Sequence, residues 1–519
     1  TLGYQTDWNN IGPSAQVAWR PNAQNGFLRT LLGDPEQATF RAGYSVGYER
    51  QGMSIFTGQF GANPGVTVNQ TRTDLSTDEN ALVRPGEPWP VYLSERNRLN
   101  VASFSPDPTY PIAIQPNRGS DLNAFAPDLV IGSGHTWTLG FQRSITRDMA
   151  MEVRYVGTRG YDQWSELNYN SIRGENLLNN GFLDEFRMAM SNLTANNASG
   201  VSSRRGSFAY FGPGSGTQPL PIHLAYFSGR TNAGDVSAYT SSNWRSTTFT
   251  SNLVRTNPSP TGMAADLEAN SGRRANAIDA GLAANFFVPN PDVDDVNVMD
   301  SGAFSDYHAL QVELRRRLSK GLSANVNYQY AIEGGSAFDG FSFGRTMIPT
   351  ANVRHAIKTQ WDWTLPVGRG ERFGADMNPL LNGILGGWSF MGVGRIQARV
   401  VNFGNVRLVG MSAGDLQEMY QFDVREDPLT GRQAVFMLPD DVILNTRRAF
   451  AISTTSVSGY TSLGAPEGRY IAPANSADCL EIVNGHCAPR TLLIRAPFFT
   501  RFDIGVQKRF PIRGSVNFE

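Results

Sequence analysis

The sequence predicts an all-β fold of antiparallel strands, and three observations lead to this prediction. Several stretches alternate apolar and polar residues with a period of two, which is typical of strands whose two faces meet different surroundings. Short turns join these stretches in pairs, and long segments separate the pairs. The composition has 11% aromatic residues, 53 glycines and only 18% charged residues, which suits strands and turns better than helical bundles.

The clearest hairpin is YHALQVELRRRLSKGLSANVNYQYA, residues 307–331. The two runs alternate on either side of a turn that contains Gly321. Each run has about ten residues, which is the length that a tilted strand needs to cross a bilayer. One face of the hairpin carries Leu310, Val312, Leu314, Val326 and Tyr328, and the other carries Gln311, Glu313, Arg315, Asn325, Asn327 and Gln329. We expect the first face to contact lipid and the second to line a polar lumen.

Four further regions repeat this pattern and bring the expected number of strands to about ten. They are SAQVAWRP with ATFRAGYSVGYE, HTWTLGFQRSIT with MAMEVRYVGTRG, RHAIKTQWDWTLP with GWSFMGVGRIQARV, and TRFDIGVQKRF, which is expected to turn through PIRG into SVNFE. The alternation places Trp137, Trp361 and Trp363 on the lipid-facing side. It places Arg501 and Asp503 on the lumen-facing side.

Two features favour a transmembrane barrel over a soluble sandwich. Arg143, Arg316 and Lys508 interrupt the apolar face near short turns, where a long cation could reach the lipid headgroups. Ordinary charges at strand ends are the alternative explanation. The segments between hairpins are also long, at about 50–134, 159–306, 334–353 and 402–498, and long loops at one end with short turns at the other are typical of outer-membrane barrels.

The long loops are predicted to contain short helices. In GFLDEFRMAMSNLTANN, helical spacing places Phe182, Phe186, Met190 and Leu193 on one face. A second helix is expected to begin at Pro439 in LPDDVILNTRRAF, because the first helical position needs no amide donor.

Other classes of protein find little support. The sequence has no run of 18 apolar residues and therefore predicts no transmembrane helix. A net charge of −1 argues against nucleic acid as a partner. The five histidines show no metal-ligand spacing, and no catalytic or cofactor motif occurs. We expect no enzymatic activity, no cofactor and no metal. Cys479 and Cys487 predict a disulfide in an oxidising compartment, with two free thiols as the alternative.

Several stretches resemble the barrel region of TonB-dependent outer-membrane receptors, and the subgroup that they resemble is the Oar-like proteins. They are YHALQVELRRRLSKGLSANVNYQYA, TWTLGFQR with MEVRYVGTRG, NIGPSAQVAWRP, NGFLDEFRMAM with GSFAYFGPG, VNFGNVRLVGM and APFFTRFDIGVQKRF. Oar-like proteins carry a carboxypeptidase-regulatory-like domain before the plug. The resemblance implies a plugged barrel of about 22 strands in the outer membrane of a Gram-negative cell, powered through TonB.

The chain departs from the family pattern at both ends. No signal peptide, regulatory-like domain, TonB box or plug is recognisable, and the chain stops at SVNFE. We therefore expect residues 1–519 to be part of one barrel domain, because an open sheet edge in lipid costs several kcal/mol for each unpaired backbone group. Contact with TonB would then be made by the missing N-terminal part.

The leading hypothesis for function is transport of an oligosaccharide, a peptide or a chelate across the outer membrane. The chain would supply barrel wall, in contact with membrane lipid, and loops that capture the ligand. An Oar-like barrel that acts in adhesion or in export of surface proteins is the alternative. A soluble secreted β-rich binding module is a weaker one, and it requires the tryptophan side of the strands to be buried under a second sheet.

Overall fold

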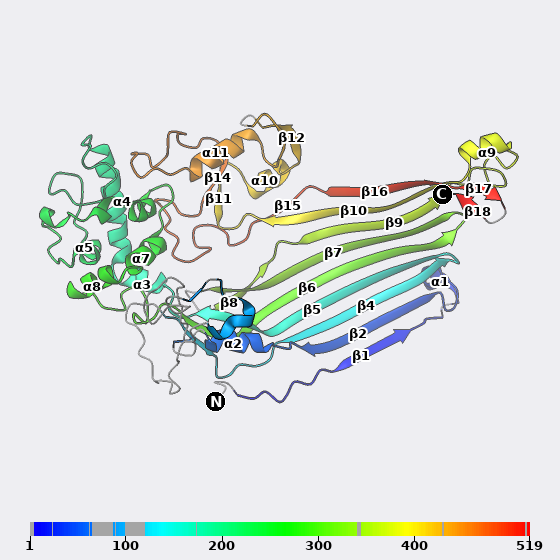
Figure 1. Ribbon diagram of the computed structural model, residues 1–519, viewed down its shortest axis with the longest axis horizontal. Coiled ribbons are helices and arrows are strands. Elements are labelled where there is room, and N and C mark those ends of the chain that lie inside the picture. Colours follow the sequence, from blue (N-terminus) through cyan, green and yellow to red (C-terminus); the bar gives the residue numbers. More distant parts are fainter. Residues whose placement is uncertain are drawn as a thin grey trace.

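The computed structural model describes residues 5–22, 24–61, 63–64, 87–88, 90, 91–98, 120–172, 174–339, 344–427, 430–513 and 516–518. Its main sheet has 12 strands, of which nine lie side by side in antiparallel order β1-β2-β4-β5-β6-β7-β9-β10-β16 (Figure 1). We call these nine strands the wall. Their bounds are β1 Ser14–Trp19, β2 Ala38–Tyr48, β4 Ser133–Thr146, β5 Met149–Asn168, β6 Val296–Ser319, β7 Leu322–Asp339, β9 Val353–Thr364, β10 Trp388–Asn402 and β16 Phe499–Lys508. Four of the five predicted antiparallel hairpins are thus present.

The turn between β6 and β7 shows why the hairpin closes where the sequence predicts. Lys320 has φ 52° and Gly321 has φ 76°, so both residues lie in the left-handed region that two-residue hairpin turns use. A Cβ at position 321 would lie 2.7 Å from the carbonyl oxygen of Thr364 on β9. Glycine is therefore needed at this position both for its conformation and for the close approach of the next strand.

The strands extend further than the sequence predicts. β6 has 24 residues and β7 has 18, whereas runs of about ten were expected. The extra length lies at the end of the wall opposite the short turns, where β6 also pairs in parallel with β3 (Leu122–Phe125) and β7 pairs with β8 (Gly344–Pro349). Alternation of apolar and polar residues fades there, so the pattern gives no signal although the backbone stays paired.

One predicted hairpin is wrong in its partner. The sequence pairs TRFDIGVQKRF with SVNFE, but β18 (Val516–Phe518) pairs with β17 (Phe510–Arg513), and β16 pairs with β10. The expected long segment 50–134 lies partly outside the described residues. Within it the structure gives α2 Met53–Gly61, the 3-10 helix η1 Leu93–Arg98 and β3.

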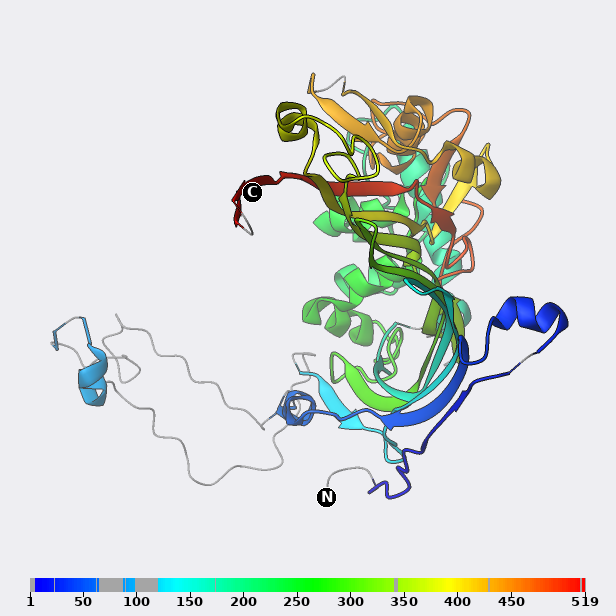
Figure 2. The ribbon, with the colours of Figure 1, turned by 90° about the vertical axis from the view of Figure 1, so that its right-hand side faces the viewer.

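The wall is a single layer that curves like a trough (Figure 2). No second sheet covers its apolar face in the described part of the chain, and Leu310, Trp363 and Ile504 are 41%, 43% and 63% exposed. The soluble sandwich required this face to be buried, so the structure does not match that alternative. Two short helices, α1 (Gly26–Leu32) and α9 (Pro379–Leu385), lie at the end with the short turns, which we call the turn end.

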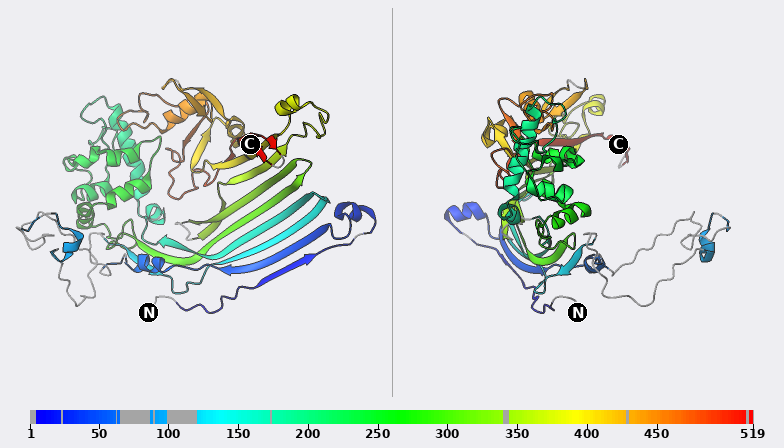
Figure 3. Two further views of the ribbon diagram at one scale, coloured as in Figure 1. Left: turned by 45° about the vertical axis from the view of Figure 1, so that its right-hand side comes forward. Right: turned by 90° about the vertical axis from the view of Figure 1, so that its left-hand side faces the viewer.

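Most other helices lie at the opposite end, the loop end, on the concave side (Figure 3). Residues 169–295 connect β5 to β6 and form what we call the helical cap. Its elements are α3 Gly174–Asn179, α4 Phe182–Ala198, α5 Pro221–Ser228, η2 Val236–Ala238, η3 Ser242–Arg245, α6 Thr247–Thr250, η4 Ser251–Leu253, α7 Pro260–Glu268 and α8 Ser271–Asp279. The prediction of a helix with Phe182, Phe186, Met190 and Leu193 on one face is confirmed, since all four are buried in α4.

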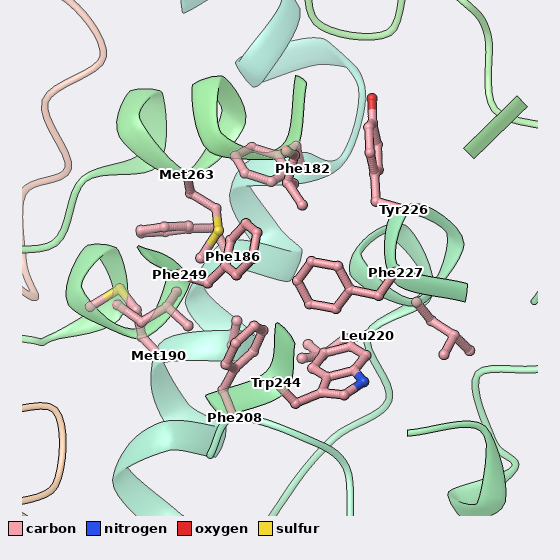
Figure 4. Close-up of a cluster of buried hydrophobic side chains, with 14 of the residues drawn as sticks. Phe182, Phe186, Met190, Phe208, Leu220, Tyr226, Phe227, Trp244, Phe249 and Met263 are labelled. Atoms are coloured by element: carbon pink, nitrogen blue, oxygen red, sulfur yellow. The ribbon is translucent and has the colours of Figure 1, made fainter. Parts of the chain in front are cut away.

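The helical cap has its own aromatic core (Figure 4). Phe208, Phe227 and Trp244 contact one another with ring centroids 4.8 to 6.1 Å apart, at the edge-to-face angles that aromatic pairs prefer. A buried carboxylate, Glu185, accepts hydrogen bonds from the backbone amides of Ile222 and His223 at the start of α5, and lies 2.7 Å from the His223 Nδ1. The helical cap is therefore held together by buried aromatic and polar contacts.

Residues 403–492 form a second loop unit beside the helical cap. It contains β11 Val406–Val409, α10 Ala413–Met419, β12 Asp423–Glu426, β13 Gln433–Phe436, α11 Asp440–Phe450 and β14 Tyr470–Pro473, and β15 (Leu493–Arg495) then returns to β10. The second predicted helix is α11, in which Pro439 is the N-cap and Asp440 the first helical residue. Asn197 of the cap donates to the Thr454 and Ser456 carbonyls at 3.0 and 3.2 Å, so the two units are joined.

None of the helices in the described residues is both long and apolar enough to span a bilayer.

Tyr239 links the stability of the helical cap to pH. Its hydroxyl accepts from the Leu220 amide and donates to the Ala233 carbonyl, and burial raises its pKa to about 12. Because the unfolded pKa is about 10, the stabilisation is complete below pH 10 and is lost as the pH rises toward 12. We expect a Tyr239→Phe variant to lose less stability than the wild-type protein between pH 10 and pH 12. The measurement is the melting temperature at each pH, recorded by tryptophan fluorescence. An unchanged alkaline profile would contradict this role.

Candidate functional site

The polar face of the wall is continuous because the strand register aligns the polar residues of neighbouring strands. Gln311 lies opposite Gln329, Glu313 opposite Asn327 and Arg315 opposite Asn325. The alignment continues over the wall to Arg501, which lies opposite Arg395. Asp503 lies opposite Val393 on the same face. All eight predicted lumen-facing residues therefore share one side of the sheet: Gln311, Glu313, Arg315, Asn325, Asn327, Gln329, Arg501 and Asp503.

A hollow of about 810 Å³ on this polar face is lined by residues that include Arg315, Asn325 and Asp503, and two further hollows lie along the same face. One, of about 290 Å³, is lined by both strands of the β6–β7 hairpin and includes Glu313 and Gln329. The other, of about 640 Å³, lies over β9, β10 and β16 and includes Lys358, Arg395 and Arg501. The positions of these hollows indicate that the polar residues line the concave side of the trough.

Few ion pairs neutralise the polar face. Arg154 Nε lies 3.7 Å from Glu152, and Arg501 Nε lies 3.3 Å from Asp503. Glu152 lies directly opposite Glu313, and like charges at such cross-strand positions repel. Much of the charge on this face is therefore open to solvent or to a ligand.

The opposite face is apolar over the same length of strand. Leu310 lies opposite Tyr330, Val312 opposite Tyr328 and Leu314 opposite Val326. The register places all eight predicted lipid-facing residues on this convex side: Leu310, Val312, Leu314, Val326, Tyr328, Trp137, Trp361 and Trp363. The two faces differ in polarity as alternation predicts, and the curvature separates them into an outer and an inner surface.

Three tyrosine–histidine pairs that the sequence pattern does not predict lie on the apolar face. Tyr44 and His135, Tyr155 and His308, and Tyr328 and His355 each join a tyrosine hydroxyl to the imidazole Nδ1, at 2.7, 2.7 and 2.9 Å. The three histidines lie opposite Val46, Gly157 and Tyr330. The paired tyrosine precedes that opposite residue by two positions in each case. The signal in the sequence was the placement of all three histidines in wall strands, each followed at even spacing by apolar residues.

The three pairs follow a line that is inclined to the strands. Tyr44 aligns across the sheet with Trp137 and His308, Tyr155 aligns with Leu310, and Tyr328 aligns with Val312. Each pair is thus two residues nearer the turn end than the preceding pair, two strands away. The line therefore rises by one residue, about 3.3 Å, at each strand, and neighbouring strands are about 4.8 Å apart. This slope corresponds to a strand tilt of about 35°, which is within the range of membrane barrels.

At the turn end the apolar face carries a second set of aromatic residues. Trp19 stacks on Phe40, and Phe40 contacts Phe141 on the next strand at a tilted angle. Trp363 lies near the end of β9, and Trp388 is the first residue of β10. His355 and Trp363 are separated by eight residues of β9, which is about 26 Å along the strand and about 22 Å perpendicular to the line of pairs. Bands of aromatic residues flank an apolar zone of about this height in membrane barrels.

The cations on the apolar face have a use that the sequence did not reveal. Arg143 donates to the Thr30 and Leu31 carbonyls of α1 at 2.8 and 2.6 Å, and Lys508 donates to the Ile384 carbonyl of α9 at 3.1 Å. Arg316 donates to the Ser319 carbonyl of its own turn at 3.2 Å. All three cations therefore have carbonyl partners at the turn end, and their contact with lipid headgroups stays a prediction.

α1 and α9 expose apolar side chains beside this face. Phe27 and Leu28 of α1 are 77% and 57% exposed, and Leu380 and Ile384 of α9 are 77% and 59% exposed. The two helices therefore continue the apolar surface of the wall beyond the last residues of the strands.

The second loop unit holds the disulfide. Cys479 and Cys487 are bonded, with Cα atoms 5.8 Å apart. In the described residues, the His486 imidazole joins the two sulfurs as a possible group of three metal ligands within 4.8 Å, but a metal requires thiolates and not a disulfide. Leu480, inside the closed loop, is buried in the core of the helical cap, so the disulfide holds a contact between the two units.

A curved single-layer sheet with an apolar convex face, a polar concave face and aromatic bands at both ends defines a wall segment of a membrane β-barrel. The chain belongs to the outer membrane β-barrel domain family, whose model matches residues 1–519. It is an outer-membrane protein in contact with lipid, as expected. No curated protein matches the chain.

Among solved structures, the chain is similar to the outer membrane transporter YddB from Escherichia coli, with 10% sequence identity. The match covers 78% of this chain and 30% of the transporter, with a TM-score of 0.28.

Removing the disulfide should loosen the contact between the two loop units. Closure of a loop of this length restricts the unfolded chain by about 2 to 3 kcal/mol. We expect a Cys479→Ser/Cys487→Ser variant to exchange amide hydrogens faster at residues 476–490, while exchange in β6 and β7 stays unchanged. Equal protection of residues 476–490 in the two proteins would show that packing of Leu480 alone holds the loop.

Proposed function

We propose that the chain forms wall and outer loops of a barrel that transports a ligand across the outer membrane. The observation that carries this proposal is the charged, hollowed concave face, which lies behind a lipid-compatible convex face. A barrel that served only as an anchor would not need a polar inner surface with few neutralising partners. The finer assignment to TonB-dependent, Oar-like receptors is part of the proposal and rests on the resemblance of the sequence motifs.

The proposed membrane position follows from the two aromatic bands. The Tyr–His pairs mark the boundary at the loop end, because an amphipathic ring is stable where one side is apolar and the other is wet. Trp363, Trp388 and the exposed apolar residues of α1 and α9 mark the boundary at the turn end. The height between them, about 22 Å, is close to that of an outer-membrane apolar band.

The helical cap and the second loop unit are proposed to capture the ligand. Both lie at the loop end, which long connections assign to the outside of the cell. The helical cap lies on the concave side of the trough (Figure 3), and the second loop unit is joined to it by the hydrogen bonds of Asn197. Residues 1–519 then act as part of one barrel domain without enzymatic activity, and a partnership with TonB belongs to the same proposal.

Uptake by cells that carry or lack the gene tests transport directly. We expect the deletion strain to take up less of at least one radiolabelled oligosaccharide, peptide or iron chelate, with recovery on complementation. Unchanged uptake combined with altered surface attachment would favour adhesion or export instead.

Neighbouring residues of one strand provide a matched test of the two faces. A Gln311→Cys variant should react with a membrane-impermeant maleimide in outer-membrane vesicles made permeable to it, because this side chain faces the polar interior. A Leu310→Cys variant should react far more slowly, because lipid covers it. The native cysteines are bonded to each other and do not contribute. Equal labelling at the two positions would contradict the proposed orientation.

A further inference from the structure

The concave face carries three cations side by side in one cross-strand row. Asn327 of β7 lies opposite Lys358 of β9, Lys358 lies opposite Arg395 of β10, and Arg395 lies opposite Arg501 of β16. We call Lys358, Arg395 and Arg501 the cation row. Since adjacent strands are about 4.8 Å apart, the three Cα atoms span about 10 Å.

Direct cross-strand neighbours of like charge destabilise a sheet, so this arrangement needs an explanation. The Nε of Arg501 lies 3.3 Å from the Oδ2 of Asp503. The described residues include no carboxylate within ion-pair distance of Lys358 or Arg395. The hollow of about 640 Å³ over these strands is lined by the three cations and by one carboxylate, Asp503, which leaves an excess of two positive charges.

The same row has the opposite charge on the other side of Asn327. Glu313 lies opposite Asn327, and Glu152 lies opposite Glu313. The acids and the cations could have alternated and neutralised one another along the row, but they are separated into two halves. The cationic half is also accessible, because Lys358, Arg395 and Arg501 are all exposed.

We propose that the cation row binds a solute that carries several phosphate or carboxylate groups about 5 Å apart. Two planar guanidinium groups can each take a phosphate or carboxylate by paired hydrogen bonds, and the lysine adds a point charge. Asn325 and Asn327 line the same hollow and offer amide donors. This inference rests on the proposed transport function and adds the charge class of the ligand.

Titration calorimetry on the full chain in detergent tests the proposal, with inorganic tripolyphosphate and with citrate as probes. We expect at least one probe to bind at low salt and to bind more weakly as added salt screens the charges. Arg395→Gln should weaken binding about five-fold, and Lys358→Gln/Arg395→Gln on the order of 25-fold. Arg395→Lys should lose less affinity than Arg395→Gln, because it keeps the charge but not the paired hydrogen bonds of the guanidinium.

Arg41→Gln is the matched control. Arg41 lies on the same polar face, on β2 opposite Gly140, so this variant loses one positive charge far from the cation row. Far-UV circular dichroism confirms that each variant retains the sheet. Failure of both probes to bind, or an equal loss in Arg41→Gln and Arg395→Gln, would overturn the inference.

Binding is measured without any transport step, so the two proposals can fail separately. Binding that depends on the cation row, without an uptake defect in the deletion strain, would leave the site in place and remove transport. An uptake defect in the deletion strain, without binding of either probe, would remove only the anionic site.

Discussion

The cross-strand register is the constraint on which the rest of the structure depends. A slip of one residue between two strands would exchange the faces of every side chain beyond it. Register therefore decides together whether Leu310 meets lipid, whether Glu313 meets the lumen and whether Tyr155 reaches His308. A wall between two unlike surroundings specifies its own register strongly, because each error buries charge in lipid and exposes apolar surface to water.

Much of the wall could be predicted because its hairpins are local. The alternation of Leu310 to Arg315 and the turn at Lys320 and Gly321 lie within one short stretch, so periodicity and turn chemistry point to the same hairpin. The assignments of the two faces follow from that parity alone. The helix α4 was predictable for a similar reason, since the spacing of Phe182, Phe186 and Met190 reports a buried helical face without any knowledge of its partners.

The features that depend on distant pairing could not be predicted. The pair of Tyr44 and His135 joins strands separated by more than 80 residues, and periodicity within a strand carries no information about register across such a loop. The cation row likewise draws one residue from each of three strands. The hydrogen bonds of Arg143 to α1 could not be predicted either, because α1 is a seven-residue helix without a strong pattern of its own.

The two faces of the wall restrict the type of residue to different degrees. This difference explains where function can vary. On the convex side any apolar residue serves between the two aromatic bands, because the lipid interior is apolar throughout. On the concave side each charge is defined by its neighbours across the strands, so an acid beside an acid or a cation beside a cation is unfavourable without a partner. An unneutralised row of like charge therefore indicates something that binds it, more strongly than the same three residues would if they were scattered over the face.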